Sequence, residues 1–577
     1  MRILLVASAF NSLTQRVFAE LGDRGHSLRV HLTVGDDPLR DAVRRHAPEL
    51  IVAPILKATI PRDVWTAHTC LIVHPGPLGD RGPSSLDWAI HEGARSWGVT
   101  VLQADEVMDG GAVWAHAGCP LPPVGKSDLY RNEISDAALE AVLRAVERFG
   151  AGDFTPRPQH GEGWDADDHD RPYLDQNVRR VDWSSDATAV VLRKLRAADS
   201  QPGVLDTLFG EEWFLHGGHP EDELGGRPGE LVATRAGAVC RATVDGAVWI
   251  PELRRRRRTG GSAPFKLPAA MALRMALGDR LPALPEVPAP LSPAEDRRTW
   301  TDIGYREDGP VGFLRFSFPG GAMSTAHCRR LLEAYRFASS RPTSVLVLGG
   351  GRDFFSNGIH LNVIEAAADP AKESWANINA MNDLVERILN TTDRLVVAAV
   401  GGNAAAGGAM LAAAADEVWC RDGALLNPYY RLMGLYGSEY WTYSLPRRVG
   451  AAAAVRLTQR AMPVTAVMAH RIGLVDQVVE ASPQEFAPRV AHMASLLAST
   501  SDVQKRIAAK KAAREHDEAV KPLADYRAEE LALMHRNFYG PGEPYHALRS
   551  AFVRKEPVRR APPHLEPGTE RAPVPRG

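Results

Sequence analysis

The stretch that most constrains the fold runs from Leu395 to Asp416. Six apolar residues, 395–400, predict a buried strand, and the glycines and alanines after them predict a turn and a closely packed helix. A second strand, 344–348, also ends in glycines and leads into the segment 354–361. Free backbone N–H groups at such turns can hold an oxyanion. Two turns of this kind therefore predict two backbone donors that share one carbonyl oxygen.

A simpler interpretation is open for either turn taken alone. Glycine and alanine also allow a helix to pack closely on a sheet without any catalytic consequence. The repetition of the pattern after two hydrophobic strands favours the functional interpretation. No side chain between the first strand and Asp416 can act as an acid or a base, so these groups must come from elsewhere.

The segment 300–480 resembles the crotonase (enoyl-CoA hydratase/isomerase) superfamily. The resemblance rests on the pattern FSxGxxL at 355–361 and on GGxxxxGG at 401–408. It implies a thioester-binding fold in which the backbone N–H groups of Ile359 and Gly407 are the oxyanion donors. It also implies CoA contacts in the two turns, at Phe355, Ser356, Gly358 and Gly408.

The resemblance does not extend to the acid–base residues of the hydratases. The positions of their two glutamates read Met410 and Tyr430, so the carboxylate pair that adds water across a double bond is missing. The aromatic cluster that contains Tyr429 and Tyr430 either packs in the core or takes part in catalysis. Glu439 is the stronger candidate, because burial between a serine and two aromatic residues would raise its pKa. We expect a thioester reaction other than hydration.

Composition argues against several other classes of protein. A chain of 577 residues is long enough for about three or four domains, and a net charge of -2 offers no basic surface for nucleic acid. The five cysteines have no CxxC spacing, which predicts neither a disulfide framework nor a metal site. No segment is apolar for long enough to be a signal peptide or a membrane span. We expect a cytoplasmic protein without a nucleic-acid or membrane partner.

The N-terminal region alternates short apolar strands with helices. This alternation of strands and helices predicts a doubly wound sheet with a ligand crevice at the carboxyl ends of its strands. The strand 70–73 delivers His74 to that edge, and Asp109 lies in a later loop from which a carboxylate can orient the imidazole. A histidine with a purely structural role is the alternative.

From His74 onward the chain resembles the folate-dependent formyltransferases. Residues 74–82 loosely match the histidine loop of the family, and 109–111 match its Asp-x-Gly motif. The resemblance implies that His74 and Asp109 promote transfer of the formyl group of 10-formyltetrahydrofolate. It places the folate contacts at Ile72, Arg81, Gly82 and Asp109. Ile72 replaces an asparagine that assists attack by an amine, so we infer a different acceptor, such as a thiol, whose thiolate is intrinsically reactive.

The middle of the chain predicts a smaller β-rich domain. A linker rich in Pro, Gly, Asp and His spans 154–170, and a helix is expected to open at Ser184 or Ser185. The strands that follow resemble the C-terminal domain of the formyltransferases. They are expected at 211–216, 229–235, 238–244 and 246–253.

Five consecutive arginines, 254–258, end this domain. They form either a solvated face or a clamp for phosphate, which arginine binds well. Arg254 is the candidate contact for the phosphates of CoA. Near the end of the chain, 545–555 resembles the terminal helix with which crotonases cover CoA, and this implies contacts at Phe552 and Lys555.

The expected architecture is a multidomain α/β protein. A doubly wound formyltransferase-like sheet is joined to a small, β-rich, OB-like domain, then to a crotonase-like α/β spiral and a helical C-terminal region. A break in the helical pattern is expected at 537–540. The expected segments are 1–155, 169–260, a linker at 261–296, 297–480, 481–560 and a disordered tail at 561–577.

The whole arrangement resembles the HypX/HoxX family of nickel–iron hydrogenase maturation factors. The resemblance implies that formyl passes from 10-formyltetrahydrofolate to coenzyme A, and that formyl-CoA then releases CO for the active-site iron. Other hydrogenase maturation proteins are the implied partners, besides the small-molecule substrates. Two alternatives stay open: an amine formyltransferase fused to an acyl-CoA hydrolase or isomerase, and a non-catalytic platform that binds CoA.

Overall fold

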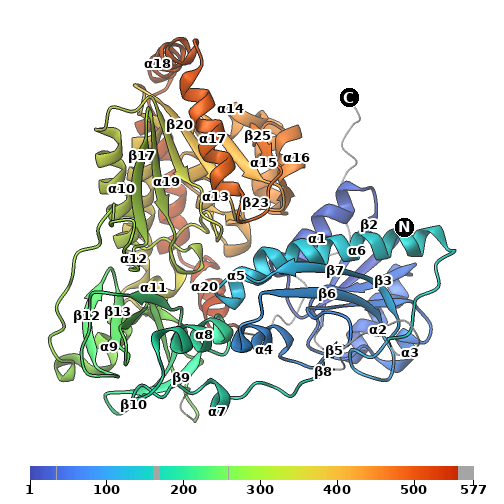
Figure 1. Ribbon diagram of the computed structural model, residues 1–577. Helices are drawn as coiled ribbons and strands as arrows, with labels where there is room; N and C mark the ends of the chain where they lie inside the picture. Colours follow the sequence, from blue (N-terminus) through green and yellow to red (C-terminus); the bar gives the residue numbers. More distant parts are fainter. Residues whose placement is uncertain (34, 160–168, 258, 557–577) are drawn as a thin grey trace. The chain divides into compact units, whose positions relative to one another are not determined.

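The computed structural model describes residues 1–33, 35–159, 169–257 and 259–556. The chain forms two compact units, and Figure 1 colours them along the sequence. The first unit comprises 1–181 and 189–205, and the second comprises 182–188 and 206–556. The tail that we expected to be disordered, 561–577, lies outside the described residues.

The first unit is built on a six-stranded sheet. In the order of the sheet, its strands are β2 (Ser27–Leu32), β1 (Arg2–Ala7), β3 (Leu50–Ala53), β4 (Cys70–His74), β6 (Ser96–Gln103) and β7 (Val113–Pro120). The first four strands are parallel, as the alternation of strands and helices predicted. The last two run antiparallel to their neighbours, and a separate short pair joins β5 (Asp80–Arg81) to β8 (His169–Asp170).

Helices cover both faces of this sheet, which is why its inner parallel strands β1, β3 and β4 are almost entirely apolar. Leu4 and Val6 pack toward α2 (Asp36–His46) and α3 (Arg62–Trp65), while α1 (Ser12–Asp23) and α6 (Glu133–Ala151) cover the opposite face (Figure 1). The remaining helices are α4 (Ser85–Glu92), α5 (Lys126–Arg131), α7 (Gln176–Arg179) and α8 (Thr188–Ala198).

The start of α8 differs from the prediction. We expected Ser184 or Ser185 to cap the helix, but Ser184 donates to Asp182 within a local turn and α8 begins at Thr188. The N–H of Thr188 is instead bound at 2.7 Å by the carboxylate of Asp245. That acceptor lies 57 residues away, so the local sequence could not reveal it.

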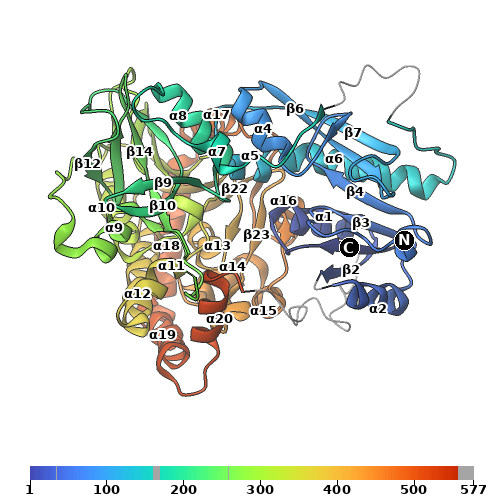
Figure 2. The ribbon, with the colours of Figure 1, turned by 90° about the horizontal axis from the view of Figure 1, so that it is seen from below.

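A small β-rich region follows, made of two four-stranded sheets (Figure 2). One sheet contains β16 (Leu267–Pro268), β15 (Glu252–Arg255), β10 (Glu211–His216) and β9 (Val204–Leu208). The other contains β11 (His219–Glu221), β14 (Ala247–Ile250), β13 (Ala238–Ala242) and β12 (Leu231–Arg235), and the helix α9 (Ala269–Leu277) follows β16. The strand predicted at 246–253 is therefore two strands in different sheets. They separate at Pro251, which has no N–H for a strand ladder.

The rest of the second unit centres on another six-stranded sheet. In sheet order its strands are β17 (Ile303–Asp308), β18 (Val311–Phe316), β19 (Val345–Gly349), β20 (Leu395–Val400), β22 (Glu417–Arg421) and β25 (Gln477–Val479). All pairs except the first are parallel. Beside it, β21 (Ala404–Ala405), β23 (Leu425–Asn427) and β24 (Val464–Thr465) form a small three-stranded sheet.

Alternate residues of β19 enter two different cores. Leu346 and Leu348 pack beneath α10 (Thr325–Ser339) and α12 (Pro370–Leu389), and Val345 and Val347 pack against α17 (Phe486–Ser499) on the other face (Figure 1). Successive side chains of a strand point to opposite faces, so this continuous apolar run buries both faces of β19.

The remaining helices follow the two glycine turns or belong to the C-terminal region. They are α11 (Leu361–Ala366), α13 (Gly407–Ala413), α14 (Trp441–Val449), α15 (Ala451–Arg460), α16 (Ala466–Arg471), α18 (Val503–Val520), α19 (Leu523–Tyr539) and α20 (Tyr545–Val553). The helical pattern was expected to break at 537–540. The helix α19 ends at the last of these positions, since it continues through Tyr539 and Gly540 caps it. Phe538 keeps this last turn helical by packing with Tyr545 in a buried cluster.

All five cysteines are free thiols. Across the described ranges, no helix has both the length and the apolar character needed to cross a bilayer.

Candidate active sites

His74 lies at the carboxyl end of β4, where the sequence placed it, and its imidazole is held between two carboxylates. Nε2 lies 2.8 Å from Oδ2 of Asp80, and Nδ1 lies 3.4 Å from Oδ2 of Asp109. His74 and Asp80 are almost fully buried. The predicted proximity of His74 and Asp109 is thus observed, whereas Asp80 was missed. Its only signal was an acidic residue in the glycine loop that follows the histidine.

Two loop residues, Gly76 and Asp109, have backbones that allow His74 to lie between the two carboxylates. A methyl group on Gly76 would collide with the imidazole and with the Asp80 carboxylate, so glycine is required there. Asp109 has a left-handed backbone, with φ of 54°, and the side chain of Gln159 donates to its carbonyl oxygen at 2.6 Å. Gln159 therefore holds the strained turn that presents Asp109.

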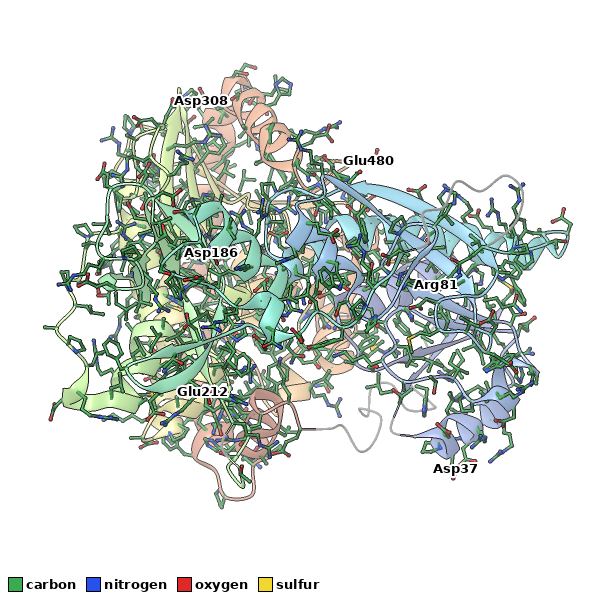
Figure 3. All side chains as sticks on the ribbon, turned by 60° about the horizontal axis from the view of Figure 1, so that its bottom comes forward. Asp37, Arg81, Asp186, Glu212, Asp308 and Glu480 are labelled. Carbon is green, nitrogen blue, oxygen red and sulfur yellow. The ribbon has the colours of Figure 1, made fainter. Side chains whose placement is uncertain are left out.

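The other expected folate contacts lie around the same loop. Ile72 is in β4, two residues before His74. Arg81, labelled in Figure 3, follows Asp80 in β5, and the N–H of Gly82 approaches the Asp109 carboxylate at 3.4 Å. One oxygen of Asp80, Oδ1, is buried without a hydrogen-bond partner among the described residues. The site therefore offers a buried imidazole, two carboxylates and the apolar side chain of Ile72, as the sequence indicated.

In the second unit, the two glycine turns meet as predicted. Ser356 pairs with Ala404 across the two segments, and a methyl group on Gly358 would lie 3.1 Å from the backbone nitrogen of Gly407. Within the described residues, no acceptor binds the N–H of Ile359 or that of Gly407. Two adjacent backbone donors without an acceptor can stabilise negative charge on a carbonyl oxygen.

The residues that we expected to touch CoA in these turns are mostly interior. The ring of Phe355 is buried against Phe316 at 5.3 Å, and the buried hydroxyl of Ser356 accepts the N–H of Gly358 at 3.1 Å. A methyl group on Gly408 would collide with the backbone oxygen of Ser356. These side chains maintain the shape of the turns, and their contacts with CoA stay a prediction.

A tyrosine–glutamate pair lies beside the two donors. The hydroxyl of Tyr430 donates to Oε2 of Glu439 at 2.7 Å, and the N–H of Ser438 donates to the same oxygen at 3.1 Å. Burial raises the pKa of Glu439 to about 7. Burial, together with the neighbouring Glu439, also raises the pKa of Tyr430. Tyr429 is only partly buried and no hydrogen bond joins it to Glu439 among the described residues, so the structure singles out Tyr430.

The second oxygen of Glu439 faces the oxyanion donors. A methyl group on Gly407 would collide with Oε1 of Glu439, which places this carboxyl group directly against the turn. Met410, which we expected at the position of a hydratase glutamate, is fully buried and apolar. The site thus combines two backbone donors with one carboxyl group of raised pKa instead of a pair of carboxylates.

Sequence reasoning missed two buried residues that bind the backbone of the turn carrying Glu439. Oδ1 of Asn382, on α12, accepts the N–H of Glu439 at 2.8 Å. Glu530, on α19, accepts the N–H of Tyr440 at 2.9 Å from 90 residues away. Neither position carried a local signal, because both act through the backbone of a distant turn.

Three arginines of the run have different surroundings. Arg255 pairs with Glu211, and Arg256 pairs with Glu212, which Figure 3 labels, both at 2.6 Å. The exposed pair of Arg256 matches the solvated face that was one of our two interpretations, whereas Arg255 is half-buried. Arg254 instead lies over the ring of Phe214 at 4.2 Å, so it is the member that remains a candidate for CoA.

Arg254 and Lys555 both lie close enough to His216 to affect its charge. Burial lowers the pKa of His216, and the positive charges of Lys266, Arg254 and Lys555 lower it further. Phe552, one of the expected CoA contacts, is 59% exposed on α20. In the parts of the chain that the structure describes, no group of three His, Cys, Asp or Glu residues could hold a metal ion.

Three family models match successive parts of the chain. The formyl transferase model matches 5–146, and the model of the formyl transferase C-terminal domain matches 174–263. The enoyl-CoA hydratase/isomerase model matches 320–540. Both predicted halves are therefore present.

The similarity to single proteins extends over the whole chain. The hydrogenase maturation factor HoxX of Bradyrhizobium diazoefficiens is 47% identical over 563 residues, which cover 97% of this chain and 96% of the relative. The chain belongs to the HypX/HoxX family. HypX from Aquifex aeolicus, crystallised in complex with tetrahydrofolic acid, is 45% identical, with a TM-score of 0.93 and 98% of each chain covered.

Membership of the HypX/HoxX family confirms the predicted multidomain α/β class, with a formyltransferase-like N-terminal region and a crotonase-like C-terminal domain. A narrower similarity joins the formyltransferase half to methionyl-tRNA formyltransferase of Thermus thermophilus. That relative is 30% identical over 216 residues, which are 37% of this chain and 65% of the relative.

Proposed function

We propose that this HypX/HoxX family member transfers formyl from 10-formyltetrahydrofolate to coenzyme A, and then decomposes formyl-CoA to CO and CoA. The folate half of the proposal is supported by the formyl transferase match and by the tetrahydrofolate bound in the HypX of Aquifex aeolicus. The CoA half is supported by the enoyl-CoA hydratase/isomerase match and by the meeting of the two glycine turns.

In the first step the thiol of CoA attacks the formyl carbon. A C–S bond forms, the C–N bond to the folate breaks, and the thiol proton passes to the leaving nitrogen. His74 is the proton carrier, and Asp80 and Asp109 hold its ring at both nitrogens. The apolar Ile72 fits a thiol acceptor better than an amine, because a thiolate needs less polar assistance at the formyl carbon.

In the second step formyl-CoA loses CO. The N–H groups of Ile359 and Gly407 hold the formyl oxygen, and Glu439 donates a proton to sulfur as the C–S bond breaks. The resulting carboxylate takes the formyl proton, and the electrons of the C–H bond stay on carbon as the lone pair of CO. Glu439 regains its proton, so HC(O)–S–CoA becomes CO and HS–CoA without any oxidant or reductant.

The observation that carries this proposal is the replacement of a carboxylate pair by a single carboxyl group. Met410 cannot deliver water, whereas Glu439, bound by Tyr430 and placed against Gly407, can move one proton between sulfur and carbon. A hydratase needs two such groups. Arg254 and Lys555 are the proposed contacts for the CoA phosphates, and the exposed Phe552 is the proposed contact for its adenine.

The deciding experiment measures CO release with a haemoprotein. Purified protein receives 10-formyltetrahydrofolate and CoA, and either one is omitted as a control. CO that requires both compounds supports the proposal. Formyl-CoA without CO would restrict the function to acyl transfer, formylation of an added amine would favour the amine formyltransferase, and CoA binding without folate turnover would favour the platform.

Family membership also suggests the destination of the CO. Since the relatives are hydrogenase maturation factors, the proposed recipient is the iron of a nickel–iron hydrogenase, reached through other maturation proteins. Cells that lack this chain should regain hydrogenase activity when CO gas is supplied. A deficit that CO does not repair would contradict this destination.

A further inference from the structure

The turn that carries Glu439 is strained and is held from two other helices. Glu439 and Tyr440 have successive left-handed backbone conformations, with φ of 60° and 57°. Such residues are costly unless their surroundings hold them. Asn382 of α12 accepts the N–H of Glu439 at 2.8 Å, and Glu530 of α19 accepts the N–H of Tyr440 at 2.9 Å.

Glu530 makes more contacts than a simple support requires. Its carboxylate also accepts the N–H and the hydroxyl of Thr442, at 2.8 and 2.6 Å, and the hydroxyl of Ser438 at 3.3 Å. All four groups donate to it. Tyr440 and Thr442 lie at the N-terminus of the nine-residue α14, where a negative charge is favoured. Both observations favour the ionised form of Glu530 and act against burial, which raises its pKa to about 7.

The surroundings of Glu439 favour the opposite state. Its two donors, Tyr430 and the N–H of Ser438, both bind Oε2, and no donor binds Oε1 within the described residues. Oε1 lies against Gly407, in the proposed path of the substrate. A proton on Oε1 would therefore point at the reacting group.

No cation compensates the two carboxyl groups. Arg527, one turn before Glu530 on α19, binds Asp383 and Glu386 and faces away. In the described part of the chain, no Lys, Arg or His lies within ion-pair distance of Glu439 or Glu530. Two buried carboxyl groups without a cation favour a single negative charge over two.

We propose that Glu530 is a positioning residue that carries the single negative charge of this pair and keeps Glu439 as the protonated acid facing Gly407. The connection between them is Ser438, which donates to Glu530 through its hydroxyl and to Glu439 through its N–H. This role rests on the proposed function, since it assigns the proton that Glu439 gives to sulfur. Because Glu530 lies on α19, the proposal also makes the C-terminal helical region part of the second site.

The test separates this role from that of a structural brace. Infrared difference spectroscopy follows the protonated carboxyl band as pH rises, and the band that Glu439→Gln removes is assigned to Glu439. Other titratable groups that face Glu439 are Tyr430 and the thiol of Cys328 on α10, whose pKa burial and Glu439 both raise above the range of the experiment. In Glu530→Gln, we expect the Glu439 band to titrate about one pH unit lower or more, because the repelling charge is gone.

Kinetics supply the second readout. We expect kcat for formyl-CoA to fall on the order of 100-fold in Glu530→Gln, with KM little changed, because the proton donor is displaced. Glu530→Asp keeps the charge and should restore the band toward its wild-type midpoint. The matched control is Glu529→Gln, on the same helix, which removes an exposed ion pair with Lys521 and should change neither readout.

Two outcomes would overturn the proposal. The first is a wild-type band that survives Glu439→Gln but disappears in Glu530→Gln, which would place the proton on Glu530. The second is an unchanged midpoint in Glu530→Gln. If Glu530→Gln does not fold, the comparison of wild type with Glu439→Gln still decides which residue holds the proton. A wild-type protein that shows the Glu439 band but releases no CO would contradict the proposed function and leave the role of Glu530 intact.

Discussion

At the scale of single residues, the first site depends on how His74 is held. Its imidazole contacts Asp80 and Asp109 at opposite nitrogens. The sequence predicted the pairing with Asp109 because a family motif carried it. Asp80 could not be predicted in the same way, since only the folded glycine loop brings its carboxylate back to the ring.

Replacement of His74 or Asp80 should therefore impair folate turnover. We expect His74→Ala to lower kcat for tetrahydrofolate formation by on the order of 100-fold or more, and Asp80→Asn by less, because the imidazole survives but loses an orienting partner. The measurement is the absorbance of tetrahydrofolate as it forms. Asp37→Asn, at a side chain that is 92% exposed, is the control. Full activity of His74→Ala would contradict the role of the histidine.

The raised pKa of the buried carboxyl group of Glu439 predicts a pH-dependent stability. Burial raises the pKa of Glu439 from 4.5 to about 7, and the negative charge of Glu530 adds to this effect. Between these values the folded chain binds more protons than the unfolded chain, so stability is full below about pH 4.5 and is lost as pH rises through 7. We expect the second unit to lose roughly 1–3 kcal/mol between pH 5 and 8 from this group.

Glu439→Gln should reduce this loss, because glutamine has no proton to release. Differential scanning calorimetry of wild type and variant at several pH values from 5 to 8 provides the test. We expect the difference in Tm between the two proteins to grow with pH in favour of the variant. Parallel curves would show that Glu439 titrates alike in the folded and unfolded chains.

At the scale of elements, the two glycine turns were the most predictable part of the second site. Their spacing is local, and β19 and β20 deliver both turns to the same edge because parallel strands end together. Elements whose ends depend on distant residues were predicted less well. The strand expected at 246–253 divides at Pro251 between two sheets, and α8 starts where Asp245 can bind its N-terminus.

A methyl group in the second turn tests how closely these elements approach. Gly408→Ala should destabilise the second unit by about 1–3 kcal/mol and reduce CO release, because the added carbon collides with the backbone oxygen of Ser356. The matched control is Gly351→Ala, where no atom lies within 4 Å of the added carbon. Calorimetry and CO assays report the two effects. Equal stability of the two variants would mean that the turn can relax.

At the scale of the whole molecule, the proposed half-reactions belong to different units. His74, Asp80 and Asp109 lie in the first unit, whereas Ile359, Gly407 and Glu439 lie in the second. The two reactions should therefore be separable by mutation. The family models agree with this division, since the formyl transferase and enoyl-CoA hydratase/isomerase matches do not overlap.

We expect Glu439→Gln to accumulate formyl-CoA from 10-formyltetrahydrofolate and CoA while releasing on the order of 100-fold less CO, because proton transfer fails only in the second step. His74→Ala should show the converse, with CO released from added formyl-CoA but not from the folate. Chromatography of the CoA esters and haemoprotein absorbance measure the two products. Loss of CO release from formyl-CoA in His74→Ala would show that the sites are not independent.

The sequence by itself determined the two strand-and-glycine turns, the βα rhythm that presents His74, and the absence of a hydratase carboxylate pair. These features are local, because the period of the hydrophobic residues, the spacing of the glycines and the residue types can be recognised in a short segment of the sequence. Only the tertiary structure decided that Asp80 faces Nε2, that Tyr430 rather than Tyr429 binds Glu439, and that Glu530 reaches the same turn from α19. These contacts join residues 6, 9 and 90 positions apart, and no local pattern specifies any of them, because loop geometry and packing bring the groups within hydrogen-bond distance.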